Sequence, residues 1–239
     1  MEKSKSGSVI HRYNDRSPTA FQTVSGMSST VEISAHIETH IGTIDSVFHE
    51  IISDTVHIDI HWVKPTDEKP FHTLITSGMS DLPMNTPAGV QGSDYAELSI
   101  CLPDDWKISE EDFKEEKNYW PFRWLKHLAR FPHENNSWLG WGHTIPNGEP
   151  AKAFADNTKL NTLLLLPTVI FDSEFSVLKL KNKTIDFFSL FPLYGEELDL
   201  KIKKGVEALN KTLIKSKLTD VLDIHRPSMI KKRKRFGLF

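Results

Sequence analysis

The 239-residue sequence has a single cysteine, little net charge and no long apolar segment. Cys101 has no second cysteine for an internal disulfide, which favours a reducing compartment, and we expect a cytoplasmic protein. No apolar run approaches the roughly 18 residues that cross a bilayer, so no membrane partner is expected. The formal net charge of −3 argues against a general nucleic-acid-binding protein.

Signatures of common enzyme classes are missing as well. The sequence contains no G-x-S-x-G, no H-E-x-x-H and no cysteine-based catalytic motif. Its start, MEKSKSGSVIHRYNDRS, is charged and polar where a signal peptide is apolar, so we expect no export by that route. The composition, with 38% hydrophobic and 26% charged residues, is that of an ordinary globular protein. A core of this size needs no disulfide or metal to hold it.

The apolar periodicity predicts an α/β fold of the α+β type, a mixed sheet covered by helices. We expect a flexible tail over 1–28, one domain over 29–227 and a basic tail over 228–239. Ser29 and Glu32 have the spacing of a capping box at the start of a long first helix. The predicted helices cover 29–51, a segment from Ser109, 121–131 and 196–223, and the last of these is either one helix or a broken pair. The predicted strands cover 56–63, 71–76, 95–102, 160–170, 175–180 and 184–191.

Aromatic residues are concentrated between Tyr119 and Gly148, which holds four of the six tryptophans. We assign Trp120 and Trp124 to the core. For Trp138 and Trp141 two interpretations stay open, because indoles serve equally as core residues and as exposed interaction platforms. Further along, the acidic pair at 196–197 is interpreted as favourable negative charge at a helix start.

His57, Asp59 and His61 alternate along a predicted strand and so share one face. Two imidazoles and a carboxylate are a plausible metal set, yet residues i and i+4 of a strand stand roughly 13 Å apart, so at most two of the three can be ligands. A solvated or hydrogen-bonded strand face is the preferred interpretation. His143 is a candidate base or ligand, and a ring hydrogen-bonded to backbone is preferred there. Cys101 is interpreted as a buried apolar residue rather than a nucleophile.

Several segments carry a family resemblance: YWPFRWLKHLARFPH, the loop WLGWGHTIPN, VHIDI, LITSGMSDLPMN, AELSICLPDDW, LLLLP and FPLYGEEL. In this order they resemble the suppressor-of-fused domain family, in its bacterial branch, over roughly residues 31–227. The resemblance implies a single domain with a mixed sheet, and neither catalytic residues nor a cofactor. It also implies a cytosolic immunity protein or antitoxin that binds a toxin encoded nearby.

In the animal member of that family, a partner peptide is held near the helix end that matches Ala129 to Phe131 and in the loop before the matching histidine. An acidic residue precedes that histidine there, whereas Gly142 stands at this position here. A second acidic position, after the strand matching LLLLP, is taken by Pro167 and Thr168. These losses would remove charged hydrogen bonds to a basic or histidine-bearing peptide.

Our leading hypothesis is a non-enzymatic immunity protein whose partner is a protein toxin. Two loops, 79–85 and 138–146, are the predicted interaction surface, and a purely structural role for their motifs stays open. The first lies within the stretch 77–92, which is long for a loop in a compact domain, and loops of that length are usually functional or mobile. One alternative is a metal-dependent hydrolase that uses the strand or loop histidines. Another is a regulatory scaffold that binds a transcription factor. The predicted partner-binding residues are Met79, Asp81, Leu82, Met84, Phe131, Trp138, Trp141 and His143.

Overall fold

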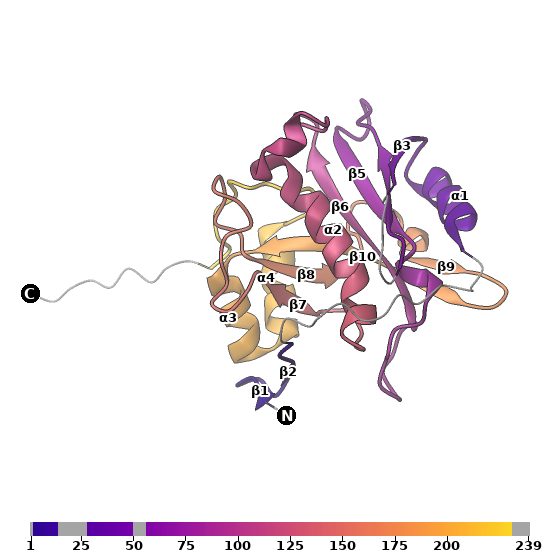
Figure 1. Cartoon of the computed structure of the whole chain (residues 1–239). Helices are drawn as coiled ribbons and strands as arrows, with labels where there is room; N and C mark the ends of the chain where they lie inside the picture. Colours follow the sequence, from indigo (N-terminus) through magenta and orange to yellow (C-terminus); the bar gives the residue numbers. More distant parts are fainter. Residues whose placement is uncertain (1, 14–27, 50–55, 231–239) are drawn as a thin grey trace, which may run out of the picture.

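The computed structural model describes residues 2–13, 28–49 and 56–230. Within these ranges an eight-stranded mixed sheet forms the centre of the molecule, in the order β3-β4-β5-β6-β10-β8-β7, with β9 paired to β10 (Figure 1). Neighbouring strands are antiparallel except for β6 and β10, which are parallel. The α+β fold predicted from the sequence is confirmed. The strands are β3 (Ile44–Phe48), β4 (Asp59–Val63), β5 (Phe71–Ser77), β6 (Tyr95–Pro103), β7 (Thr144–Pro146), β8 (Thr162–Leu166), β9 (Val177–Lys179) and β10 (Thr184–Leu193).

Helices cover both faces of this sheet (Figure 1). The long helix α2 (Glu116–Glu134) packs on one face, where its buried side chains join those of β4, β5, β6 and β8 in the largest apolar core. On the other face, α1 (Thr30–His40) covers residues of β4, β5 and β10. The pair α3 (Gly195–Lys204) and α4 (Val206–Ser216) covers β8 and the end of β10. The short 3-10 helices are η1 (Met79–Asp81), η2 (Asp112–Lys114) and η3 (Ser173–Ser176).

The first predicted helix was too long. It ends at His40, and the chain continues as strand β3. Gly42 has a φ of +152°, and its N–H donates to the Ile37 carbonyl, so the chain turns out of the helix at this residue. The predicted capping box is also absent: the Ser29 side chain makes no cap, and its backbone N–H donates to Asp81 instead.

A helix was predicted over 121–131, with Pro121 at its start and Pro132 just past its end, but helix α2 continues through both prolines. Pro121 is its sixth residue and lacks one N–H donor, but Trp120 and Phe122 beside it are fully buried, and this packing offsets the loss. The separate helix expected from Ser109 is reduced to the single turn η2, although the Ser109 hydroxyl does accept from the Asp112 N–H at 3.1 Å. Tertiary packing here overrides the local proline signal.

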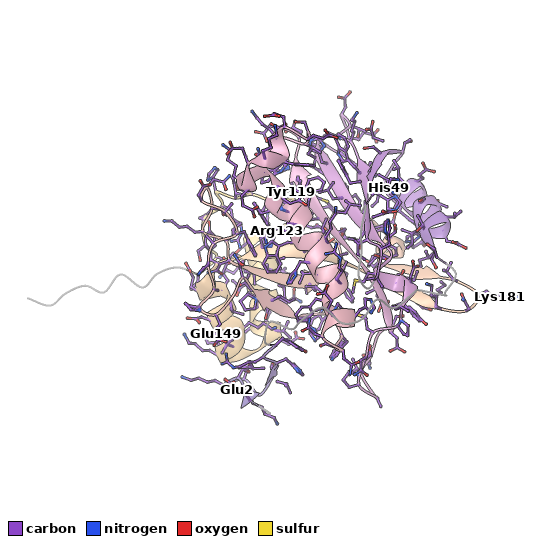
Figure 2. All side chains as sticks on the ribbon, in the orientation of Figure 1. Glu2, His49, Tyr119, Arg123, Glu149 and Lys181 are labelled. Atoms are coloured by element: carbon purple, nitrogen blue, oxygen red, sulfur yellow. The ribbon has the colours of Figure 1, made fainter. Side chains whose placement is uncertain are left out.

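The C-terminal helical region is a broken pair, one of the two forms left open by the sequence. The break falls at Gly205, whose φ of +87° is accessible to glycine at little cost. At the other end of the chain, residues 2–13 contain a short hairpin of β1 (Glu2–Lys3) and β2 (Val9–Ile10), within the stretch predicted as a tail. Arg12 forms ion pairs with Glu2 and Glu149, which lie near each other in Figure 2. Among the described residues, the helices are all too short or too polar to cross a bilayer.

Candidate interaction surface

The two loops predicted to bind a partner lie side by side at the C-terminal end of α2. The Asn85 N–H donates to the Ser137 carbonyl at 2.9 Å, and the Leu139 N–H donates to the Met84 sulfur at 3.4 Å. The His133 ring Nε2 lies 2.9 Å from the Met79 carbonyl oxygen. Two segments more than 50 residues apart are thus held together by backbone and side-chain hydrogen bonds.

The first of these loops, 79–85, is largely packed into the protein. Met79 and Met84 are buried in the main core, so their side chains present no surface to a partner. Asp81 is half-buried and accepts from the Ser29 N–H at the start of α1, and burial raises the pKa of its carboxyl. Leu82 packs partly against the same core. Of the predicted contact residues in this loop, Asp81 and Leu82 reach the surface.

The second loop presents its two tryptophans differently. Trp141 is 44% exposed, while Trp138 is half-buried and stacks edge-on against His143 with ring centres 4.2 Å apart. The expected hydrogen bond from the His143 ring to backbone is not formed with any described residue, and Trp138 is its neighbour instead. Burial, with smaller contributions from Lys201 and His11, lowers the pKa of His143 to about 4. His143 is neutral at pH 7 as a result.

Gly142 fixes this loop to strand β8 and lies against helix α4. Its N–H donates to the Leu165 carbonyl at 2.8 Å, and its φ is +74°. A Cβ at this position would come within 2.8 Å of the Val206 side chain in α4. Any larger side chain directly before His143, an acidic one included, would have to displace the Val206 side chain. Trp141 is therefore displayed from a loop whose backbone is held in place.

The remaining predicted contact residue, Phe131, lies near the end of α2 and is covered by the N-terminal segment. The Tyr13 ring meets it edge-on with ring centres 4.9 Å apart, and the Tyr13 hydroxyl is hydrogen-bonded to Ser137. Nearby, Lys201 of α3 donates to the Thr144 hydroxyl at 2.8 Å, and burial lowers the pKa of its ammonium group to about 8. The sequence analysis missed both Tyr13 and Lys201, since neither belongs to a motif.

The predicted strand set is only partly assembled. His57 and Asp59 are 3.1 Å apart, between the ring Nε2 and one carboxylate oxygen, whereas the buried His61 ring turns to the Ser77 hydroxyl at 2.9 Å. Burial lowers the pKa of His61. That at most two of the three can be metal ligands stays a prediction. Cys101 is buried, and burial raises the pKa of its thiol, which makes it a poor nucleophile.

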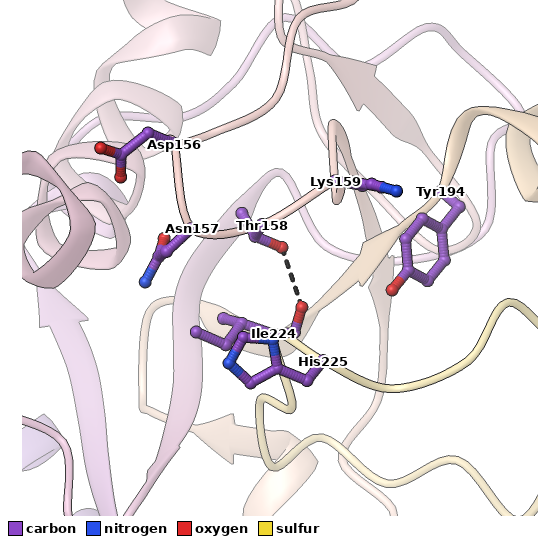
Figure 3. Close-up of a pocket in the computed structure, with 7 residues that line it drawn as sticks. All are labelled: Asp156, Asn157, Thr158, Lys159, Tyr194, Ile224 and His225. Carbon is purple, nitrogen blue, oxygen red and sulfur yellow. Dashed lines mark hydrogen bonds between the residues drawn. The ribbon is translucent and has the colours of Figure 1, made fainter.

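A pocket of about 320 Å³ lies away from the two loops, between the 156–159 segment and the C-terminal segment (Figure 3). Two of the hydroxyl groups that line it are bonded to the C-terminal segment. The Thr158 hydroxyl donates to the Ile224 carbonyl at 3.1 Å, and the Tyr194 hydroxyl donates to the Arg226 carbonyl. These contacts hold the C-terminal segment on the domain and do not converge on the open space. The residues that line the pocket are Asp156, Asn157, Thr158, Lys159, Tyr194, Ile224 and His225.

These features define an α+β scaffold with an anchored aromatic loop at one end of α2. The chain belongs to the suppressor of fused protein (SUFU) family, whose model matches residues 54–227. The structure resembles that of a putative SUFU homologue from Neisseria gonorrhoeae, with a TM-score of 0.60, 16% identity, and coverage of 84% of this chain and 96% of that one. It also resembles a chain in the Sufu-Fu complex, with a TM-score of 0.59, 16% identity, and coverage of 86% and 93%. No curated protein sequence matches this chain.

Proposed function

We propose that the chain is a non-enzymatic, cytosolic immunity protein that binds a protein toxin encoded nearby and neutralises it. Membership of the SUFU family supports a protein-binding role, and one solved relative of the same fold is described as a complex of Sufu with Fu. The bacterial homologue with the same fold supports placement in the bacterial branch.

The observation that carries this proposal is Trp141. Its indole is 44% exposed on a loop that Gly142 fixes to β8 and α4. A rigid, exposed tryptophan loses little conformational entropy on binding and offers a large apolar surface, and tryptophan is enriched among residues that dominate binding energy. Trp138 and Leu82, both partly exposed, extend the proposed contact around it.

We expect Trp141→Ala to weaken toxin binding by at least 30-fold, the typical effect of a hot-spot truncation of about 2 kcal/mol. The partner is first identified by capture with the full-length protein and mass spectrometry. Its affinity for wild type and variants is then measured by calorimetry, and protection of cells that express the toxin is scored in parallel.

Ile214→Ala is the matched control. Ile214 is 70% exposed on α4, so its truncation removes a comparable apolar surface away from the loop. It should leave affinity and protection unchanged. If the toxin binds a folded Trp141→Ala variant as tightly as the wild type, the loop is not part of the binding site. A captured partner that is harmless when expressed alone would refute the immunity function itself.

A further inference from the structure

A cluster of two histidines and an aspartate forms where strands β3 and β4 pair. Phe48 of β3 lies opposite Ile60 of β4 in an antiparallel pair, so the next step of the same register places His49 opposite Asp59. His57 is two residues before Asp59, and alternate residues of an extended chain share a face. Strand alternation and cross-strand register together bring the three side chains onto one side of the sheet.

The contacts in this cluster are close and converge on one carboxylate. His49 Nδ1 is 3.1 Å from one oxygen of Asp59, and His57 Nε2 is 3.1 Å from the other. One ligand atom from each residue lies within 4.8 Å of the other two. The Asp59 side chain is only 12% exposed, while those of His49 and His57 are 69% and 52% exposed. Figure 2 labels His49 on the side of the molecule formed by β3 and α1.

The backbone around this cluster is held in place. Gly78, just before η1, has a φ of +106°, and a Cβ there would lie 1.9 Å from the His57 carbonyl oxygen. The close approach of Gly78 fixes the backbone at His57. On β4 itself, His61 is held by Ser77 of β5 and does not compete for the cluster.

We propose that His49, His57 and Asp59 form a binding site for one divalent transition-metal ion, with Zn²⁺ as the ion that best suits two imidazoles and a carboxylate. Zinc bonds to nitrogen and oxygen are about 2.0–2.2 Å long, and ligand atoms around a tetrahedral zinc are therefore roughly 3.3 Å apart. The observed nitrogen to oxygen distances of 3.1 Å are close to this spacing. Three protein ligands leave a fourth position, on the solvent side of the exposed imidazoles, for water or another donor.

A second group of this kind, His40 with Asp172 and Glu174, makes a useful comparison. There the Asp172 carboxylate accepts from the Phe175 N–H at the start of η3 and is more than half exposed. Only one imidazole is available in that group. Its ligand atoms suit a metal ion less well than two imidazoles around a largely buried carboxylate.

The test is a calorimetric titration of full-length, tag-free protein with ZnCl₂ after treatment with a chelator. We expect one saturable equivalent of Zn²⁺ for the wild type. His49→Ala and His57→Ala should each weaken this binding at least 10-fold, and His49 is exposed enough for its variant to fold normally. His40→Ala is the control and should bind as the wild type does. Bound Co²⁺ should give the wild type, but not His49→Ala, the visible absorption of a tetrahedral site.

Stability gives a second readout, because an ion that binds only the folded state raises the melting temperature. Saturating Zn²⁺ should raise it for the wild type and for His40→Ala, and not for His49→Ala or His57→Ala. The proposal is overturned if the wild type takes up no saturable equivalent, or if both histidine variants bind as tightly as the wild type. This outcome leaves the immunity function untouched, since that function rests on Trp141 and toxin protection.

Discussion

Replacing Arg226 with methionine should lower the free energy of unfolding by about 3–5 kcal/mol, because it leaves the buried Glu197 carboxylate without its counter-charge. Glu197 is completely buried, and the Arg226 side chain is only 7% exposed. A carboxylate in such surroundings is stable only when its charge is compensated and its oxygens are hydrogen-bonded. Urea unfolding followed by circular dichroism measures the change.

The Glu197 carboxylate accepts four hydrogen bonds from three residues. One oxygen accepts from Arg226 at 2.6 Å and from the Tyr194 N–H at 2.9 Å, and the other accepts from Arg226 and from the Met229 N–H, each at 2.8 Å. Arg226 also donates to the Pro192 carbonyl at 2.9 Å. This cluster joins the end of β10, the start of α3 and the C-terminal segment, so its loss loosens all three.

Two further variants separate a lost ion pair from lost packing. The double variant Glu197→Met with Arg226→Met should recover much of the stability, because an apolar pair of similar size leaves no buried charge. Lys203→Ala is the surface control: its partner Asp199 is one helical turn away, both side chains are more than half exposed, and the change should be below about 0.5 kcal/mol. If Arg226→Met unfolds at the same urea concentration as the wild type, the pair does not stabilise the domain.

This cluster also marks what sequence reasoning misses. The acidic pair at 196–197 was interpreted as charge at a helix start, and the Glu197 carboxylate does accept from the Tyr194 N–H there. Nothing in the local sequence shows that Glu197 is buried, because its partner Arg226 lies 29 residues further along the chain. The glutamate itself falls within a family motif, FPLYGEEL, and this was the available signal.

The sheet was predictable where strand alternation was strong, as in β4, β5 and β6, and where apolar residues filled both faces, as in β8. The first helix was overextended because Ile44 and Phe48 continue a helical spacing that strand pairing with β4 overrides. The sequence predicted two helices where α2 is a single helix, because the local effect of a proline takes no account of the burial of Trp120 and Phe122. Both errors come from contacts between distant residues.

The candidate surface was predicted in outline only. The family motifs gave both loops, and the structure joins them through Asn85 with Ser137 and Met84 with Leu139. Which side chains face solvent could not be read from the motifs, since methionines and tryptophans serve equally well as core or as surface. His49 was missed because its part in the cluster depends on the β3 to β4 register.

The second large effect concerns pH and Glu97, a buried glutamate on β6. Its oxygens accept from the Thr76 hydroxyl at 2.6 Å, and from the Ser80 N–H and hydroxyl at 2.9 and 2.7 Å. These bonds favour the ionised form, but complete burial outweighs them and raises the pKa of Glu97 to about 7, with a small further contribution from Asp81. The ordinary value is 4.5.

Because the pKa is raised in the folded state, the proton on Glu97 favours folding at low pH. Below pH 4.5 the Glu97 carboxyl is protonated in both the folded and the unfolded state, so it does not change the free energy of unfolding. Between pH 4.5 and 7 the unfolded carboxyl ionises while the folded one keeps its proton, so this group lowers the free energy of unfolding by about 1.4 kcal/mol per pH unit. The total loss by pH 8 is on the order of 3 kcal/mol.

Glu97→Gln should remove this contribution, since the amide oxygen can still accept from Ser80 and the group no longer ionises. The difference in unfolding free energy between variant and wild type, measured in urea from pH 5 to 8, should rise with pH by roughly 2.5 kcal/mol in favour of the variant. Glu110→Gln, which removes an exposed carboxylate, should give a difference that stays flat. A flat difference for Glu97→Gln would mean that its carboxyl ionises in the folded protein as readily as in water. Ser80, which donates to Glu97, lies in η1. That result would therefore also mean that water reaches the glutamate beneath the 79–85 loop.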